Sequence, residues 1–511
     1  MPESASPRPA TSIALAGVFL VPLALVALAE WRGFHAAGGL GGFFLDLARH
    51  AGARPGSISG YGPDAVPMAY PVFGLWFIAL FDRLGLVTMQ SLLWIGYALY
   101  GVALVAIYRL AVAFSKNALA AAIATALYAL SPAAIEFATD AGGYVRALGL
   151  LFTATALVFA HRVFLREPDR AGVAAIILCG AFTGLAVGTH PQEALFCVVS
   201  IVYFAVFRRP WLRALQRLVA VGAVALLVSS PWWAPIVLHG GLSPILQAGG
   251  SRHAARLYWF LTLFRATSGS FVSTLGPIAF CLALYDLSRG RLVLPGWLFL
   301  AGFTLGEPRT LLVGALLAAR FMAEWAPAAP PETALPKPWQ KYLLAAHRHA
   351  ALLIGAALLV VQLFEGLAYV TPALDPHARA HPFTATVASG FVWLREHTPP
   401  GARFVVLGDA GEEFPVTAGR TDLLSYRGRE WTSRHPTFTD YSEKIVPAIT
   451  ACATVACTLP VLAGHALAAD FYVIPRQGFL DANAQARWDS AQAAPAAKIV
   501  YRNADIIVLS P

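Results

Sequence analysis

The stretch VTMQSLLWIGYALYGVALVAIYRLAVAFSKNALAAAIATALYALSPAAI, residues 87–135, decides the fold class. It holds two apolar runs, 87–108 and 118–135, and the residues between them include Arg109 and Lys116. A helix of roughly 17 to 25 apolar residues is long enough to cross the hydrocarbon core of a bilayer. The stretch therefore predicts two transmembrane helices joined by a basic loop.

Apolar runs of this kind recur along most of the chain. Hydrophobic residues make up 58% of its 511 residues, charged residues make up 13%, and the mean hydropathy is +0.62. This composition excludes a soluble globular protein of this size. We predict an all-α polytopic membrane domain of about 11 transmembrane helices over residues 1–371, and a small α/β domain over residues 372–511. The predicted spans are 11–29, 87–108, 118–135, 145–163, 171–188, 191–207, 216–233, 268–287, 292–306, 309–326 and 350–371.

The formal net charge is +9, and the positive residues are distributed as in a membrane protein rather than as in a nucleic-acid-binding protein. Lys and Arg gather in five clusters between apolar runs, and an excess of these residues marks cytoplasmic loops. Counting spans between the clusters predicts a multi-pass protein of the cell membrane whose C-terminal domain is extracytoplasmic. The clusters are Arg109 and Lys116; Arg162, Arg166 and Arg170; Arg208, Arg209, Arg213 and Arg217; Arg289 and Arg291; and Lys337, Lys341 and Arg348.

The first outer loop, residues 30–85, stays on one side of the membrane only if its apolar piece, 67–82, does not cross. That piece is short and contains Pro67, Pro71 and Gly74, so we predict an interfacial helix.

The polar tail alternates a helical pattern with strand-like runs. We predict a helix over 383–397 and strands within 403–409, 470–476 and 498–510, hence a small α/β domain. Cys452 and Cys457 lie in this tail, where an extracytoplasmic location would permit a local disulfide; two free thiols are the alternative.

Four outer segments resemble the membrane glycosyltransferases of the GT-C type, in particular bacterial relatives of the dolichyl-phosphate-mannose-type mannosyltransferases. The polar stretch EEFPVTAGRTDLLSYRGREW in the tail is also similar to that set. The four segments are FFLDLARHAGARP with YGPDAVPMAYPVFGLWFIALF, then FATDAGGYVRALGLLF, GTHPQEALF and SPWWAPIVLHGGLSPIL.

The resemblance implies transfer of a sugar from a polyprenyl-phosphate-linked donor to a cell-envelope glycan, lipid or protein at the outer face of the membrane. Such a reaction needs a carboxylate that accepts a proton, or a divalent metal that does equivalent work. It also needs a cation that binds the leaving phosphate. The sequence leaves the metal open, and it contains no recognisable metal-ligand motif.

The resemblance places a carboxylate shortly after the first span, where this chain has Leu40 or a flanking glycine. Asp140, two residues before a glycine pair, is therefore our first catalytic candidate, and Asp46 is the second. The structural alternatives are an N-cap or solvated loop residue for Asp140 and a polar-face residue with Arg49 at i+3 for Asp46.

The substrate-binding candidates are cations and aromatic residues of the outer segments. Arg146 opens a span, where free amides and the helix dipole favour an anion, and a snorkelling arginine is the alternative. Arg309 also opens a span, with a structural pair to Glu307 as the alternative. The remaining candidates are His190, Tyr70, Arg252 and His253.

The sequence THPQ also has a local explanation. We predict a capping box in which Thr189 is the N-cap, Pro191 lies in the first turn and Gln192 is at N3. His190 would then belong to the turn rather than to a binding site.

Two other functions remain. A non-catalytic relative that binds lipid-linked glycans or acts as a scaffold would explain the missing first-loop carboxylate. A transporter is disfavoured because few ionisable residues fall at mid-membrane depth.

Overall fold

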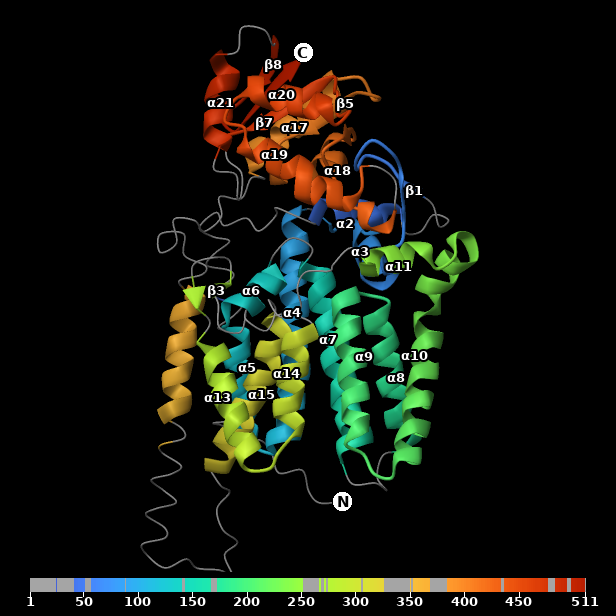
Figure 1. The fold of residues 1–511 in the computed structure, drawn as a ribbon, viewed down its shortest axis with the longest axis vertical. Coiled ribbons are helices and arrows are strands. Elements are labelled where there is room, and N and C mark those ends of the chain that lie inside the picture. The colour runs from blue at the N-terminus through green and yellow to red at the C-terminus, as the bar shows by residue number, and fades with distance from the viewer. Residues whose placement is uncertain are drawn as a thin grey trace, which may run out of the picture.

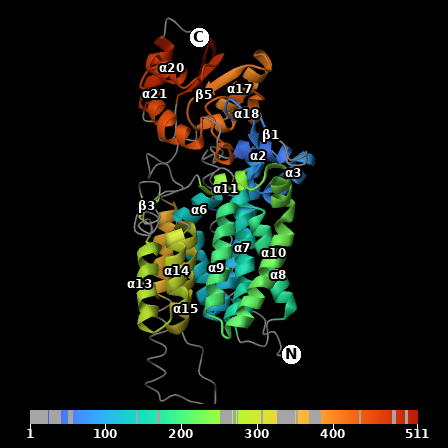
Figure 2. The same cartoon turned by 45° about the vertical axis from the view of Figure 1, so that its right-hand side comes forward.

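The computed structural model of the chain has a bundle of helices with a smaller C-terminal domain at one end (Figure 1). Both views place the first-loop helices α2 (Gly41–His50) and α3 (Val72–Arg83) between these two parts (Figure 2). The structure describes residues 24, 41–50, 57–87, 89–139, 143–166, 172–250, 266–267, 271–272, 274–304, 307–325, 350, 353–367, 384–432, 436–476, 483–493 and 498–510.

Most of the predicted spans that fall within the described residues are helical. Two differ: the span predicted at 268–287 begins with strand β4 (Phe271–Val272) and becomes helical at Leu275, and the span predicted at 118–135 is divided between two helices that end at Ala129 and begin at Pro132. Among the described residues, three helices are long and apolar enough to cross a membrane: Trp94–Ser115, Gly143–Leu165 and Trp211–His239. The first predicted span, 11–29, lies almost wholly outside the described residues, so the number of crossings stays a prediction. The bundle helices are α4 (Met89–Ser115), α5 (Ala118–Ala129), α6 (Pro132–Thr139), α7 (Gly143–Ala160), α8 (Val173–Val187), α9 (Pro191–Val206), α10 (Trp211–Gly240), α13 (Leu275–Ser288), α14 (Val293–Thr304), α15 (Glu307–Trp325) and the helix Leu353–Leu367.

Small residues let neighbouring helices approach closely. A Cβ at Gly180 of α8 would lie 2.6 Å from the Val224 Cβ of α10, and one at Gly184 would lie 2.7 Å from the Val228 Cβ. Glycines four residues apart on one helix face are a common device for helix packing in membranes, where lipid offers no hydrophobic driving force.

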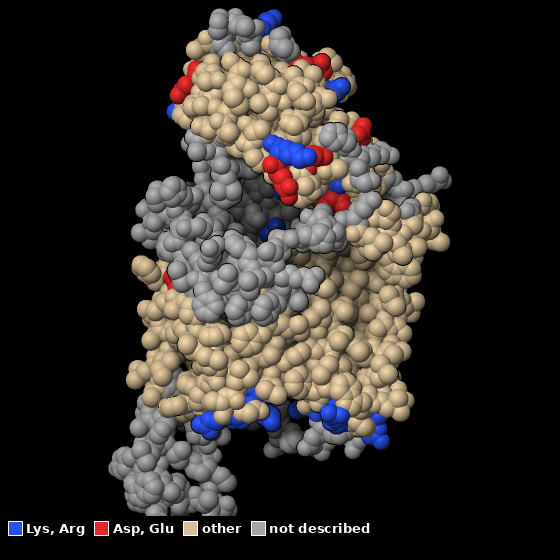
Figure 3. All heavy atoms as spheres, viewed as in Figure 1, with Lys and Arg blue, Asp and Glu red and all other residues tan. Residues whose placement is uncertain are grey.

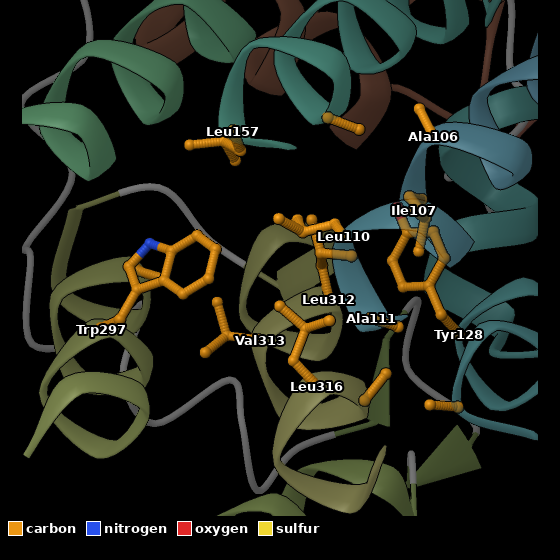
Figure 4. Close-up of a cluster of buried hydrophobic side chains, with 14 of the residues drawn as sticks. Ala106, Ile107, Leu110, Ala111, Tyr128, Leu157, Trp297, Leu312, Val313 and Leu316 are labelled. Carbon is orange, nitrogen blue, oxygen red and sulfur yellow. The ribbon is translucent and has the colours of Figure 1, made fainter. Parts of the chain in front are cut away.

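The centre of the bundle is a close-packed apolar core (Figure 4). Leu110 of α4, Leu157 of α7, and Leu312 and Leu316 of α15 are buried there. Trp297 is also fully buried, and its indole nitrogen donates to the Ser200 hydroxyl at 2.8 Å. This bond satisfies the polar edge of an otherwise apolar side chain.

The outer surface of the bundle is apolar as well. Leu215, Val219, Leu226 and Leu227 of α10 are exposed. A broad exposed surface of this kind suits contact with lipid tails.

Lys and Arg gather at the end of the bundle opposite the C-terminal domain (Figure 3). Two of the predicted clusters contact each other there, because Arg208 donates to the Arg166 carbonyl at 2.5 Å and Arg217 to the Val163 carbonyl at 2.8 Å. We call this the basic end and the opposite one the domain end. The cluster of Lys337, Lys341 and Arg348 lies outside the described residues.

The first loop forms a small unit at the domain end. Its strands β1 (Ser57–Ile58) and β2 (Val66–Pro67) pair antiparallel. Arg49 of α2 binds Asp82 of α3 through two contacts of 3.1 Å. Helix α3 starts after Pro71 and docks on the bundle, where the Phe73 amide donates to the Gly188 carbonyl at 2.8 Å. A helix is thus confirmed within the predicted interfacial piece.

Two further elements lie in the chain between α10 and α13. They are the short helix α11 (Ser243–Gly250) and the antiparallel pair β3 (Ala266–Thr267) and β4 (Phe271–Val272).

The C-terminal domain is built on a mixed five-stranded sheet in the order β6-β5-β7-β9-β8. Strand β5 is parallel to β6 and β7, whereas β9 is antiparallel to β7 and β8. The predicted strand region 498–510 is a pair of strands rather than one, because the turn at Asn503 reverses the chain. The strands are β5 (Arg403–Val406), β6 (Thr421–Asp422), β7 (Phe471–Pro475), β8 (Lys498–Arg502) and β9 (Ile506–Ser510), and the helices are α17 (Ala385–His397), α18 (Phe414–Ala418), α19 (Val446–Ala451), α20 (Val455–Gly464) and α21 (Ala484–Ala493).

A disulfide joins Cys452 and Cys457 at the start of α20. Of the two alternatives open from the sequence, the structure therefore has the bonded pair. The predicted boundary near residue 372 falls outside the described residues and stays a prediction.

The first loop is joined to the C-terminal sheet by backbone hydrogen bonds. Tyr61 forms a parallel bridge with Asp422 of β6, the Gly62 amide donates to the Asp422 carbonyl at 2.8 Å, and the Asp422 amide donates to the Gly60 carbonyl at 2.9 Å. Trp431 packs on Phe43, with ring centroids 6.0 Å apart. We call this contact the seam; its residues include Gly42, Phe43, Tyr61, Glu413 and Trp431.

Candidate functional site

Side chains from four helices meet around the Phe137 ring at the domain end. The Arg309 guanidinium lies 4.9 Å from the ring centroid and the Arg146 guanidinium lies 5.6 Å from it. The His190 ring meets Phe137 edge to face at 6.3 Å. An electron-rich ring face attracts guanidinium groups, which helps two cations share one site. We call this group, completed by Gln192 and Glu193, the Phe137 cluster.

The start of α9 positions three members of the cluster. His190 is the N-cap, and its Nδ1 accepts from the Glu193 amide at 3.4 Å. The predicted capping box is therefore wrong: the Thr189 hydroxyl donates back to the Leu185 carbonyl at 2.6 Å, and Glu193 rather than Gln192 is at N3. The preference for Thr as N-cap was overridden because that hydroxyl bonds to the preceding helix.

A glycine brings α7 against this turn. A Cβ at Gly149 would lie 2.9 Å from the His190 Cβ and 3.1 Å from the Glu193 Cγ. Any larger residue at position 149 would push α9 away from α7 and spread the Phe137 cluster.

Arg309 and Glu193 form a buried ion pair. Arg309 is 4% exposed and Glu193 is 1% exposed, and the closest nitrogen–oxygen distance is 2.7 Å. Arg309 also donates to Gln192 Oε1 at 3.3 Å. Arg309 therefore has partners on α9, while its alternative pairing with Glu307 is not tested, because the Glu307 side chain lies outside the described ones.

Arg146 is only partly buried, in contrast to Arg309. It lies in the first turn of α7, where unpaired backbone amides and the helix dipole favour a bound anion. The cluster therefore contains one arginine neutralised by a carboxylate and a second, more accessible one on the same ring.

Asp46 lies in the other half of the domain end, on α2. Its side chain is 15% exposed, with one oxygen 3.3 Å from His50 Nδ1 and the Tyr61 hydroxyl close by. Burial raises the pKa of Asp46 above its ordinary value, against the opposing effects of His50, Arg49 and Tyr61. The i+3 residue Arg49 makes its ion pair with Asp82 instead.

Tyr70 connects the first loop to the C-terminal domain. Its ring lies 4.7 Å from Phe44 and 6.2 Å from Trp431, centroid to centroid. Tyr144 of α7 packs on Phe44 at 6.3 Å and precedes Arg146 by two residues. The seam and the Phe137 cluster thus border the same first turn of α7.

The structure brings together three of the sequence candidates, Arg146, His190 and Arg309. Asp46 and Tyr70 lie instead at the first loop. Asp140, Arg252 and His253 fall outside the described residues. Sequence reasoning missed Phe137, Gln192 and Glu193, although an acidic residue at the third position of an apolar helix was a usable signal.

Figure 3 shows a hollow between the C-terminal domain and the bundle. A Lys or Arg side chain lies within it, and Asp or Glu side chains lie at its edge. Among the residues that the structure describes, no three His, Cys, Asp or Glu side chains group in a way that would hold a metal ion.

Residues 69–234 match the family model of the dolichyl-phosphate-mannose-protein mannosyltransferases. This segment carries Tyr70, Arg146 and His190 and the helices from α3 to most of α10. No curated protein sequence matches the chain.

Solved structures share the fold at low sequence identity. The oligosaccharyltransferase of Archaeoglobus fulgidus, tethered to an acceptor peptide, is 14% identical with a TM-score of 0.58, over 98% of this chain and 74% of that one. ArnT from Cupriavidus metallidurans, bound to undecaprenyl phosphate, is 14% identical with a TM-score of 0.57, over 96% and 97%. The mycobacterial arabinofuranosyltransferase AftD is 16% identical with a TM-score of 0.54, over 99% and 40%.

These likenesses agree with the resemblance expected from the outer segments. They concern the bundle and the small mixed sheet together, since they extend over nearly the whole chain. The chain has the fold of these multi-pass membrane glycosyltransferases, and its residues 69–234 are similar to the dolichyl-phosphate-mannose-protein mannosyltransferases.

Proposed function

We propose that the protein transfers a sugar from a polyprenyl-phosphate-linked donor to a cell-envelope acceptor at the outer face of the membrane. The convergence of Arg146, His190 and Arg309 on the Phe137 ring carries this proposal. Positive charge at the domain end, next to a hollow and above an apolar bundle, suits an anionic headgroup with a lipid tail.

Arg146 binds the leaving phosphate in this proposal. It is the more accessible cation of the Phe137 cluster and lies at a helix N-terminus, so charge and backbone amides act on the same anion. Arg309, held by Glu193 and Gln192, keeps the ring and the second cation in place. His190 and Tyr70 contact the substrate near the cluster and the first loop, and Arg252 and His253 add positive charge.

The transfer step joins the acceptor oxygen to the anomeric carbon of the sugar. The bond from this carbon to the phosphate oxygen breaks, and its electron pair leaves on the phosphate, whose charge Arg146 balances. A carboxylate takes the proton of the acceptor hydroxyl. Asp140 and Asp46 are the candidates that the sequence offers, because both belong to outer loops.

The proposal requires that the domain end faces away from the cytoplasm. The basic end supports this orientation, since Lys and Arg accumulate on the cytoplasmic side. The disulfide between Cys452 and Cys457 supports it as well, because disulfides persist in oxidising compartments.

A non-catalytic role in binding lipid-linked glycans is the second candidate. The observation in its favour is the glycine run at the start of α2, which leaves that part of the first loop without a carboxylate.

The test uses a strain lacking its own copy of the gene and complemented with variants. Wild type should restore the glycolipid profile, whereas Arg146→Ala should leave the donor accumulating; Arg213→Ala at the basic end is the matched control. Native mass spectrometry with undecaprenyl phosphate as the probe should give a complex that Arg146→Ala weakens. Binding without any change in glycolipids on deletion would favour the non-catalytic role, and absence of both would reject the proposal.

A further inference from the structure

The Glu413 carboxylate lies against the first turn of α2, although it belongs to the C-terminal domain. Glu413 is 0% exposed. A Cβ at Gly42 would lie 2.9 Å from the Glu413 Cα and would overlap the carboxylate. The glycine therefore provides the space that the glutamate side chain occupies.

Glu413 lacks the partners that a structural carboxylate has. Neither of its oxygens has a well-formed hydrogen bond among the described residues, although the Gly42 amide points towards the carboxylate. Burial raises the pKa of Glu413 well above its ordinary value, with the Gly42 amide opposing and Glu412 reinforcing the effect. Leaving a buried acceptor unsatisfied is costly, so such a group calls for a functional reason.

Two neighbouring carboxylates accept the hydrogen bonds that a buried carboxylate usually has. Glu412 accepts from Arg427 Nε at 2.6 Å. Asp422 is as buried as Glu413, and its Oδ1 accepts from the Val406 and Leu424 amides, each at 3.0 Å. Glu413 thus differs from these two neighbours in that neither of its oxygens has a well-formed hydrogen bond among the described residues.

Polar groups of the bundle and first loop surround Glu413. Burial raises the pKa of the Tyr61 hydroxyl, and the nearby Asp46 and Glu413 carboxylates raise it further. The Tyr144 hydroxyl is buried without a hydrogen-bond partner among the described residues and lies within electrostatic reach of Glu413 and Tyr70. Tyr144 and Arg146 both lie in the first turn of α7, so Glu413 is near the helix turn that carries the proposed phosphate site, although the two side chains leave the helix in different directions.

We propose that Glu413 is the carboxylate that accepts the proton of the acceptor hydroxyl, so that the C-terminal domain supplies the carboxylate that the glycine run at the start of α2 lacks. This inference rests on the proposed function and deepens it. It places Glu413 ahead of Asp140 and Asp46 in the role of proton acceptor.

The sugar-transfer step is unchanged, and Glu413 is the group that receives the proton. As the acceptor oxygen bonds to the anomeric carbon, the O–H proton passes to a Glu413 oxygen and the phosphate leaves with the electron pair. An incoming hydroxyl supplies the hydrogen bond that this oxygen lacks. The raised pKa brings this carboxyl closer to the operating pH, and its ionised form is the one that accepts the proton.

Glu413→Gln is the first test, because it keeps the shape and a hydrogen-bond acceptor but cannot take a proton. Membrane vesicles of the complemented deletion strain supply the acceptor, and the donor fraction extracted from the deletion strain is added in increasing amounts. We expect the maximal rate to fall by about a hundredfold or more. The amount of donor that gives half of the maximal rate should change little. Glu396→Gln, an exposed position of α17, is the matched control.

A purely structural role predicts a different outcome. If Glu413 only caps α2, Glu413→Gln should keep its rate, and that result would overturn the inference. The variant should also bind undecaprenyl phosphate as wild type does, which shows that the fold and the phosphate site are intact.

A reciprocal exchange keeps the inference testable if Glu413→Gln is poorly folded. The double variant Gly42→Asp/Glu413→Gly moves the carboxylate to the first loop and removes the overlap with the glutamate side chain, although the close contact with the Cα of residue 413 remains. We expect it to be at least tenfold more active than Glu413→Gly alone. Equal activity of the two variants would contradict the inference, while an inactive wild type would reject the proposed function itself.

Discussion

The Phe137 cluster and the seam bury charged groups at the same end of the bundle, but they treat them differently. In the cluster, Arg309 and Glu193 neutralise each other at 2.7 Å. At the seam, Glu413 is buried without a well-formed hydrogen bond among the described residues. The Phe137 cluster therefore holds a fixed geometry, whereas the seam keeps a proton acceptor available. The following predictions test this difference.

The largest expected effect is the loss of one partner in the buried pair. Arg309→Met leaves the Glu193 carboxylate unpaired, and breaking a buried pair in this way costs about 3–5 kcal/mol. Thermal unfolding of the purified protein should show a marked loss of stability. The double variant Arg309→Met/Glu193→Gln should recover much of it, and a double variant no more stable than the single one would show that the pair is not what holds the cluster together.

The second prediction concerns pH and the seam. Burial raises the pKa of Asp422 from 3.8 to about 7, partly offset by the Val406 and Leu424 amides. The protonated form is favoured in the folded state, so its contribution to stability is complete below about pH 4 and is lost as the pH rises through about 7. This contribution to the free energy of unfolding is on the order of 4 kcal/mol.

Asp422→Asn provides the check on this pH dependence. An asparagine can still accept both amides through Oδ1, the atom that receives them in the wild type. Thermal unfolding measured between about pH 4 and pH 7 should show a flatter profile for the variant. Identical profiles would mean that Asp422 is ionised in the folded protein throughout this range.

The third prediction concerns packing at the seam. Gly42→Ala places a Cβ 2.9 Å from the Glu413 Cα, a backbone atom that cannot move without shifting α18. Overpacking of this kind costs about 1–3 kcal/mol. Gly101→Ala is the control, because a Cβ there meets nothing within 4 Å. Equal unfolding temperatures for the two variants would place α2 and Glu413 further apart than described.

The smallest effect is expected for an ion pair at the surface. Arg49 is 43% exposed where it binds Asp82, and exposed pairs contribute about 0.2–1 kcal/mol. Arg49→Ala should therefore shift thermal unfolding only slightly, and less in high salt. A loss as large as that of Arg309→Met would remove the distinction between buried and exposed pairs.

Much of the bundle follows from the sequence alone. Apolar runs located α4, α7 and α10, because lipid requires long continuous helices with internal hydrogen bonds. Helices α4 and α10 nevertheless each extend seven residues beyond the predicted end. Local capping was less predictable: the Thr189 hydroxyl bonds to the preceding helix, and His190 takes the N-cap position.

The seam lay beyond sequence reasoning for a physical reason. Gly42 and Glu413 are separated by more than 370 residues, and neither carries a periodic signal that predicts contact with the other. Arg309 and Glu193 are similarly remote, so the sequence could propose each arginine but not its partner. Helix patterns predict elements, whereas sites made between elements depend on the tertiary packing.

A cryo-electron microscopy map of the purified protein with undecaprenyl phosphate tests the central claim most directly. We expect a phosphate within hydrogen-bond distance of Arg146 at the domain end, with the lipid tail along the apolar surface of the bundle. A phosphate bound instead at the basic end, near Arg208 and Arg217, would contradict it.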